Sequence, residues 1–78
     1  MLDMERKSPE YWKNMGNEFF QKGRYPVAIR CFVKALHLDP GYLEAWNNLG
    51  FTYKKMGKTE EARRCNEKVR EIKKIREQ

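Results

Sequence analysis

Few side chains in this sequence are of the types that carry out catalysis or hold a metal ion. His37 is the only histidine, and Cys31 and Cys65 are the only cysteines. A metal site needs more ligands at close spacing, and a nucleophile needs a base together with a third group that orients it. We therefore expect a chain that is not an enzyme and uses no metal or cofactor. Both cysteines are expected to be reduced and partly buried.

The charged residues are the second group that could bind something. The net charge of the 78-residue chain is +6, and its last third is rich in lysine and arginine. Five glutamates are interleaved with these basic residues: Glu60, Glu61, Glu67, Glu71 and Glu77. Opposite charges three or four residues apart favour a solvated helix face. The alternative is a basic surface that attracts an acidic peptide, a nucleic acid or a membrane.

Four amphipathic helices are expected to position these side chains, over about residues 9–22, 26–38, 43–56 and 60–76. Apolar residues recur in each segment at spacings of three and four, which is the period of a helix with one buried face. Residues 1–8 form a lead-in to the first helix. This lead-in ends at Ser8, a hydroxyl N-cap that stands directly before Pro9.

Short breaks separate the predicted helices. Gly23 and Gly57 follow the first and third helices, at the position where glycine takes up a left-handed conformation. Pro40 stops the second helix because it cannot continue the backbone hydrogen bonds, and Thr59 is expected to cap the fourth. Connections this short make consecutive helices antiparallel. Gly16, inside the first helix, predicts a close approach by a neighbouring helix.

The chain matches itself when it is shifted by 34 residues, a period typical of stacked helix-turn-helix units. The identical pairs are Glu10/Glu44, Trp12/Trp46, Asn14/Asn48, Gly16/Gly50, Gly23/Gly57, Ala28/Ala62, Arg30/Arg64, Cys31/Cys65 and Lys34/Lys68. Such a period predicts an all-α solenoid in which each unit packs on the next.

Both the period and the residues at fixed positions resemble the tetratricopeptide repeat. A first repeat, 9–42, carries the family pattern as Trp12, Met15, Gly16, Phe19, Gly23, Ala28, Phe32, Ala35 and Pro40. A second repeat, 43–76, keeps Trp46 and Gly50 but has Asn66 in place of the aromatic residue and Lys74 in place of the proline. The resemblance implies two stacked hairpins in a right-handed α-solenoid, with the charged helix 60–76 as a terminal cap.

In that family, the first helix of each repeat lines a concave groove that binds an extended peptide or a partner segment. The resemblance therefore implies a non-enzymatic protein-interaction module, or scaffold. Its polar groove residues are expected to point away from Trp12 and Trp46. The candidate peptide-binding residues are Lys13, Asn17, Asn48, Phe51, Lys54 and Lys55.

Three of these candidates match a more specific site within the family. Lys13, Asn17 and Asn48 occupy three positions of the carboxylate clamp with which some members bind the acidic C-terminal tails of cytosolic chaperones. The remaining cationic positions of that clamp belong to a third repeat. A partner with an acidic C-terminal tail is thus one candidate, beside a generic peptide groove.

Two other functions stay open. An apolar edge of Val69, Ile72 and Ile75 would let copies of the chain associate into a homo-oligomer as a structural repeat. The basic last third offers a weaker alternative, the binding of nucleic acid. No membrane partner is expected, because no apolar run approaches the ~20 residues of a membrane span. The N-terminal residues lack the apolar region of a secretory signal, so we expect a cytoplasmic location.

Overall fold

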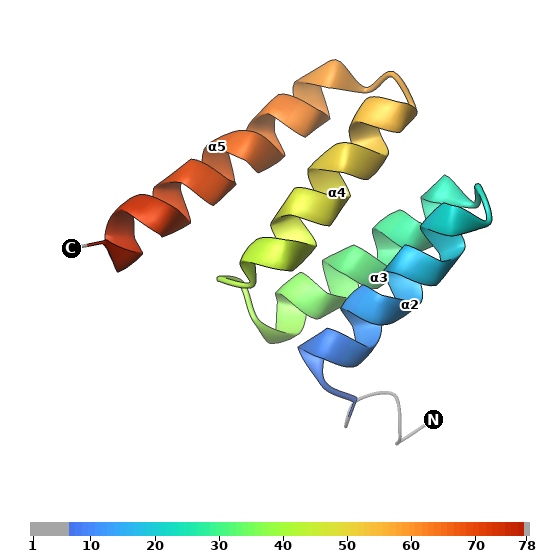
Figure 1. Ribbon diagram of the computed structural model, residues 1–78, viewed down its shortest axis with the longest axis horizontal. Helices are drawn as coiled ribbons and strands as arrows, with labels where there is room; N and C mark the ends of the chain where they lie inside the picture. Colours follow the sequence, from blue (N-terminus) through green and yellow to red (C-terminus); the bar gives the residue numbers. More distant parts are fainter. Residues whose placement is uncertain (1–6, 78) are drawn as a thin grey trace.

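The computed structural model describes residues 7–77, which form four α-helices joined by short turns. The helices are α2 (Pro9–Gln21), α3 (Tyr25–Leu38), α4 (Leu43–Lys55) and α5 (Thr59–Arg76). Helix α2 packs against α3 and α4 packs against α5, while α4 also contacts both α3 and α2 (Figure 1). The predicted all-α fold of two stacked helix hairpins is therefore confirmed.

The ends of the helices follow the local signals in the sequence, with one exception. The Ser8 hydroxyl accepts a hydrogen bond of 3.0 Å from the Tyr11 backbone N–H, so the predicted N-cap of α2 is confirmed. Gly23 and Gly57 have φ values of 77° and 78°, as expected for glycines that follow a helix. Of the predicted lead-in, residues 1–6 lie outside the described residues.

The exception is Thr59, which is the first residue of α5 and not its cap. The backbone N–H of Lys58 donates to the carbonyl of Tyr53 at 2.9 Å and closes the end of α4. This closure leaves Lys58 as the N-cap residue, and its side chain makes no capping bond. Helix α5 therefore begins one residue earlier than it would if Thr59 were its cap. The prediction that Thr59 caps the fourth helix is wrong.

The core lies where the two hairpins meet, and one aromatic ring fills its centre. Phe32 is fully buried, and a Cβ atom on Gly16 would lie only 2.5 Å from the Phe32 ring. The predicted close approach at Gly16 is thus confirmed. Trp12 and Trp46 are half-buried and pack against the same cluster, whose buried members are Ala28, Phe32, Ala35, Leu36, Ala45, Leu49 and Cys65.

The far end of α5 is held by a contact to the turn between the hairpins. The Arg76 guanidinium donates to the carbonyl of Gly41 at 2.6 Å. Along the predicted apolar edge, Val69 is buried, Ile72 is half-buried and Ile75 is 70% exposed. The edge is therefore smaller than the sequence predicts, and one exposed isoleucine is ordinary on a protein surface. Self-association through α5 remains a prediction.

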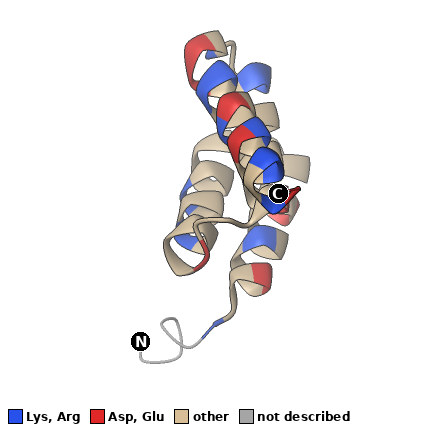
Figure 2. Ribbon diagram, turned by 90° about the vertical axis from the view of Figure 1, so that its left-hand side faces the viewer, with Lys and Arg blue, Asp and Glu red and all other residues tan. Residues whose placement is uncertain are grey.

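The charges on α5 pair along the helix. Arg63 bonds both Glu60 and Glu67, the latter at 2.6 Å, and Lys68 lies 3.8 Å from Glu71. The hydrogen bond from Arg63 lowers the pKa of the Glu60 carboxyl. Figure 2 shows basic and acidic residues alternating along this helix, which agrees with the predicted solvated face. Among the described residues, no helix combines the length and apolar composition needed to cross a membrane.

Candidate functional site

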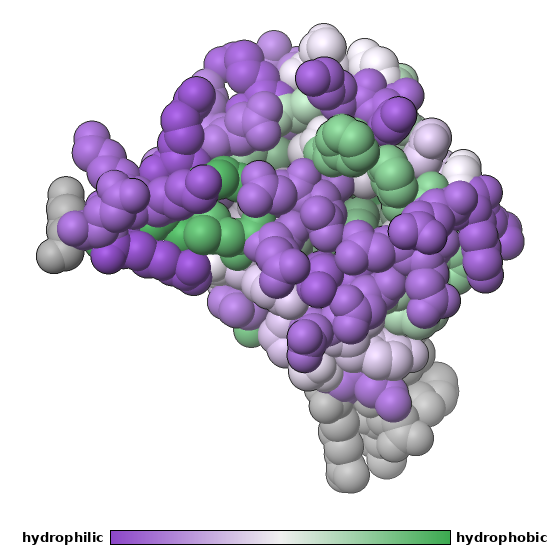
Figure 3. Space-filling view, viewed as in Figure 1, coloured by the Kyte–Doolittle hydropathy of each residue, from purple (hydrophilic) through white to green (hydrophobic). Residues whose placement is uncertain are grey.

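Helices α2 and α4 carry all six candidate binding residues, and the stacking of the two hairpins brings these helices into contact. Figure 3 shows an apolar area, above the centre, enclosed by hydrophilic side chains on the face where α2 lies in front of α3. We define this face by Asn17, Phe20, Asn48, Phe51, Lys54 and Lys55, and we call it the concave surface after the groove that the resemblance predicts.

Lys13 does not point outward as expected. It is only 8% exposed, and its ammonium lies 3.6 Å from a carboxylate oxygen of Glu44 in the first turn of α4. It also lies close to Tyr42: burial raises the pKa of the Tyr42 phenol, and the positive charge of Lys13 opposes that rise. The long side chain fills the space where α4 begins beside α2. The prediction that Lys13 points away from the interior is therefore wrong.

Asn17 and Asn48 are brought together across the two helices. The side-chain amide of Asn48 donates to the Asn17 oxygen at 2.9 Å, and the pair is partly buried. The backbone carbonyl of Asn48 also accepts a bond of 2.7 Å from the hydroxyl of Thr52. The bond between the amides uses one donor of Asn48 and one oxygen of Asn17. Their other polar atoms have the right chemistry to bond a peptide backbone.

Phe51 is the most prominent apolar side chain of the concave surface. It is 54% exposed, and its ring centroid lies 5.5 Å from that of Phe20, which in turn lies 5.2 Å from Tyr25. The Lys55 ammonium is 5.7 Å from the centre of the Phe51 ring. Phe51, Lys54 and Lys55 line a hollow of about 350 Å³. Three of the six candidates thus lie together: Phe51, Lys54 and Lys55. We call the neighbouring rings of Phe20, Tyr25 and Phe51 the aromatic platform.

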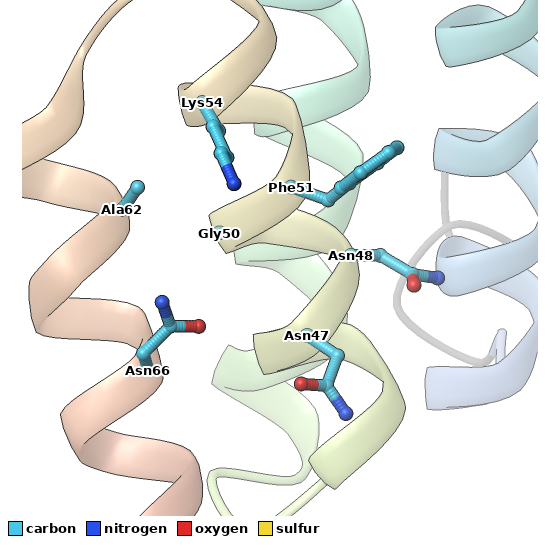
Figure 4. A pocket seen from close by; sticks show the side chains of 7 residues that line it. All are labelled: Asn47, Asn48, Gly50, Phe51, Lys54, Ala62 and Asn66. Carbon is cyan, nitrogen blue, oxygen red and sulfur yellow. The ribbon is translucent and has the colours of Figure 1, made fainter.

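A second hollow, of about 350 Å³, lies between α4 and α5 and is lined by Asn47, Asn48, Gly50, Phe51, Lys54, Ala62 and Asn66 (Figure 4). The side chains of Lys54 and Asn66 point into the space over Gly50, whereas those of Phe51 and Asn48 point toward α2. Asn66 takes the place that Phe32 holds in the first hairpin, and it does not fill the space that a phenyl ring would.

Four residues that line this hollow are not among the binding residues that the sequence predicts: Asn47, Gly50, Ala62 and Asn66. The signal was present in the repeat, because Phe32 corresponds to Asn66 after a shift of 34 residues. The shift thus places a small polar residue where the first hairpin has an aromatic ring. The structure adds that the smaller polar side chain also opens a hollow beside Gly50.

The two cysteines have little reactivity in this fold. Both are free and buried, and burial raises the pKa of each thiol, in the case of Cys65 to about 11. The thiolate is the reactive form, so neither thiol is suited to act as a nucleophile at neutral pH. Within residues 7–77, no three side chains of the metal-binding types gather to hold an ion.

The raised pKa of Cys65 predicts a loss of stability in alkali. An unfolded thiol ionises near its ordinary pKa of 9.0, whereas the folded thiol ionises only near about 11. The stabilisation is thus fully present below pH 9 and is lost as the pH rises toward 11. Urea midpoints measured across this range should fall, and they should fall less for Cys65→Ala. An equal fall in both proteins would contradict the assignment.

Comparison with known protein families identifies the repeat. A sequence model described as "TPR repeat" matches residues 16–57, and one described as "Tetratricopeptide repeat" matches residues 43–74. An uncharacterized protein of Methanocaldococcus jannaschii is 38% identical over 64 residues, which make up 82% of this chain and 74% of that protein.

Two longer relatives match over a small part of their length. Hsp70-Hsp90 organizing protein 2 of Arabidopsis thaliana is 32% identical over 77% of this chain and 10% of its own length. The human protein O-mannosyl-transferase TMTC3 is 30% identical over 78% of this chain and 7% of its own length. Their names describe different roles, so the shared segment does not by itself carry the role of either protein.

Proposed function

Because the chain belongs to the tetratricopeptide repeat family, we propose that it is a non-enzymatic protein-interaction module whose concave surface binds an extended segment of a partner protein. We propose that the repeats 9–42 and 43–76 together form this module. The observation that carries it is Phe51, a large aromatic side chain that is 54% exposed beside Phe20. Aromatic side chains of this kind are enriched among the residues that dominate protein interfaces.

The binding mode follows from what each group can contribute. An apolar side chain of the partner would cover the Phe51 ring and remove its surface from water. The amides of Asn17 and Asn48 would bond the partner's backbone through the atoms that their mutual bond leaves available. Lys54 and Lys55 would attract carboxylates at the end of the surface where α4 ends. An extended segment fits this row of groups because they follow one another along α2 and α4.

The charges favour a partner with acidic residues. We assign the acidic end of the partner to Lys54 and Lys55, since Lys13 is buried against Glu44. Lys13 therefore has a supporting role, holding α4 beside α2. The resemblance of Asn17 and Asn48 to positions of the carboxylate clamp makes an acidic C-terminal tail the first such partner to test. A cytoplasmic location is part of the proposal and agrees with two free, buried cysteines.

Affinity capture from a cell extract tests the proposal. The immobilised wild-type chain should retain a set of partner proteins, and Phe51→Glu should lose them because it places a charge on the aromatic platform. Val33→Glu is the matched control: Val33 is 37% exposed and lies on α3, outside the concave surface. Circular dichroism should show that both variants fold. If Phe51→Glu retained the same partner proteins as the wild type, the proposal would be wrong.

A further inference from the structure

In the first hairpin, α2 and α3 form a groove in which α4 packs. Helix α4 contacts both α2 and α3, and its Trp46 and Leu49 lie against Leu36 of α3. The bottom of this groove is apolar, because Phe32 is fully buried there and Leu36 is 9% exposed. A pair of antiparallel helices thus forms a groove in which a third helix packs.

The repeat places the same groove between α4 and α5, where residues 7–77 supply no further helix to cover it. At three positions of this groove, the second hairpin has a polar residue where the first has an apolar one: Asn66 corresponds to Phe32, Arg70 to Leu36 and Lys54 to Phe20. All three replacements are exposed. A helix that entered this groove would therefore meet amide and basic groups where α4 meets apolar ones.

The hollow over Gly50 lies in this groove, and its lining suits an anion. Lys54 and Asn66 point into it (Figure 4), and none of its lining residues is acidic. Within residues 7–77, neither Lys54 nor Arg70 takes part in an ion pair. On α5, Glu60 and Glu67 are paired with Arg63 and Glu71 with Lys68, whereas Glu61 takes part in no ion pair among the described residues. The positive charge of the groove is thus available to a ligand.

The spacing of the polar groups matches a helical ligand. Asn66 and Arg70 are four residues apart on α5 and lie on one side of it. Two carboxylates four residues apart on an opposing helix would meet them with the same spacing.

We propose that the groove between α4 and α5 is a second docking site, which adjoins the concave surface and shares Lys54 with it, and that its occupant is an acidic helix of a partner protein. One carboxylate of that helix accepts hydrogen bonds from Lys54 and Asn66 in the hollow over Gly50. A second carboxylate, one turn along, pairs with Arg70.

Fluorescence anisotropy at physiological salt tests this site with a defined probe. The probe is a fluorescein-labelled 18-residue amphipathic helical peptide of alanine, leucine and glutamate, with its glutamates four residues apart. We expect it to bind the wild-type chain and to bind Arg70→Glu at least about tenfold more weakly. Asn66→Asp, which places a negative charge beside Lys54 in the hollow, should weaken binding similarly.

Matched controls separate this site from general attraction to a basic chain. Arg64→Glu makes the same charge change on another side of α5 and should alter binding by less than about twofold. A peptide with glutamine in place of each glutamate should bind at least about tenfold more weakly than the probe. Equal losses in Arg64→Glu and Arg70→Glu, or equal binding of the glutamine peptide, would overturn the proposal. So would undiminished binding of a proline-containing probe of the same charge, because that peptide cannot be helical.

Discussion

Replacing Phe32 with alanine is expected to lower the free energy of unfolding by about 3–5 kcal/mol. The ring is fully buried and packs against Gly16, so its removal leaves a cavity where the two hairpins meet. A chain of this size has a total stability of only about 4–12 kcal/mol. The variant should therefore be largely unfolded at temperatures that the wild type tolerates.

The repeat supplies the matched control for this prediction. Asn66 occupies the corresponding position in the second hairpin but is exposed, so Asn66→Ala should change stability by less than about 0.5 kcal/mol. Urea-induced unfolding of both variants, followed by circular dichroism at the helical wavelength, provides the comparison. If the two substitutions cost the same, Phe32 is not the centre of the core.

Replacing Phe51 with alanine is expected to weaken partner binding by about 30-fold, which corresponds to about 2 kcal/mol. The reason is the loss of the exposed ring that an apolar side chain of the partner would cover. Stability should change little, because the Phe51 side chain is 54% exposed. Isothermal titration calorimetry with the segment of the captured partner that binds the chain measures the effect.

Two further variants test whether the Phe51 ring contacts the partner directly. Val33→Ala removes a comparable apolar side chain outside the concave surface and should leave the affinity unchanged. Lys55→Ala should weaken binding only a few-fold and should reduce the dependence of affinity on salt, since an exposed charge is well screened. A change of less than about twofold in Phe51→Ala would show that the platform is not an anchor.

Most of the fold follows from local and periodic signals in the sequence. Ser8 and Pro9 mark the start of α2, and Gly23 and Gly57 take the left-handed conformation that closes α2 and α4. These signals depend on a few neighbouring residues, so they can be interpreted without the fold. The predicted cap at Thr59 is wrong because the bond from the Lys58 N–H to the Tyr53 carbonyl closes α4 and leaves Lys58 as the N-cap residue of α5.

The site was less predictable because side-chain direction depends on neighbours that are distant in the sequence. The sequence predicts that Lys13 points outward, but its side chain is buried beside α4, next to Glu44 and Tyr42. The bond between Asn17 and Asn48 likewise joins two helices whose contact no local pattern specifies. The replacement of Phe32 by Asn66 is visible in the repeat, but the hollow that it leaves beside Gly50 depends on how α4 packs against α5.

The most direct test of the concave surface as the binding site is a ¹⁵N heteronuclear NMR titration of the chain with the captured partner segment. Chemical shifts should change most for the backbone amides around Phe51 and Lys55 and for the side-chain amides of Asn17 and Asn48. The outer face of α3, including Val33, should change little. Shift changes centred on α3, with Phe51 and its neighbours unaffected, would contradict this account.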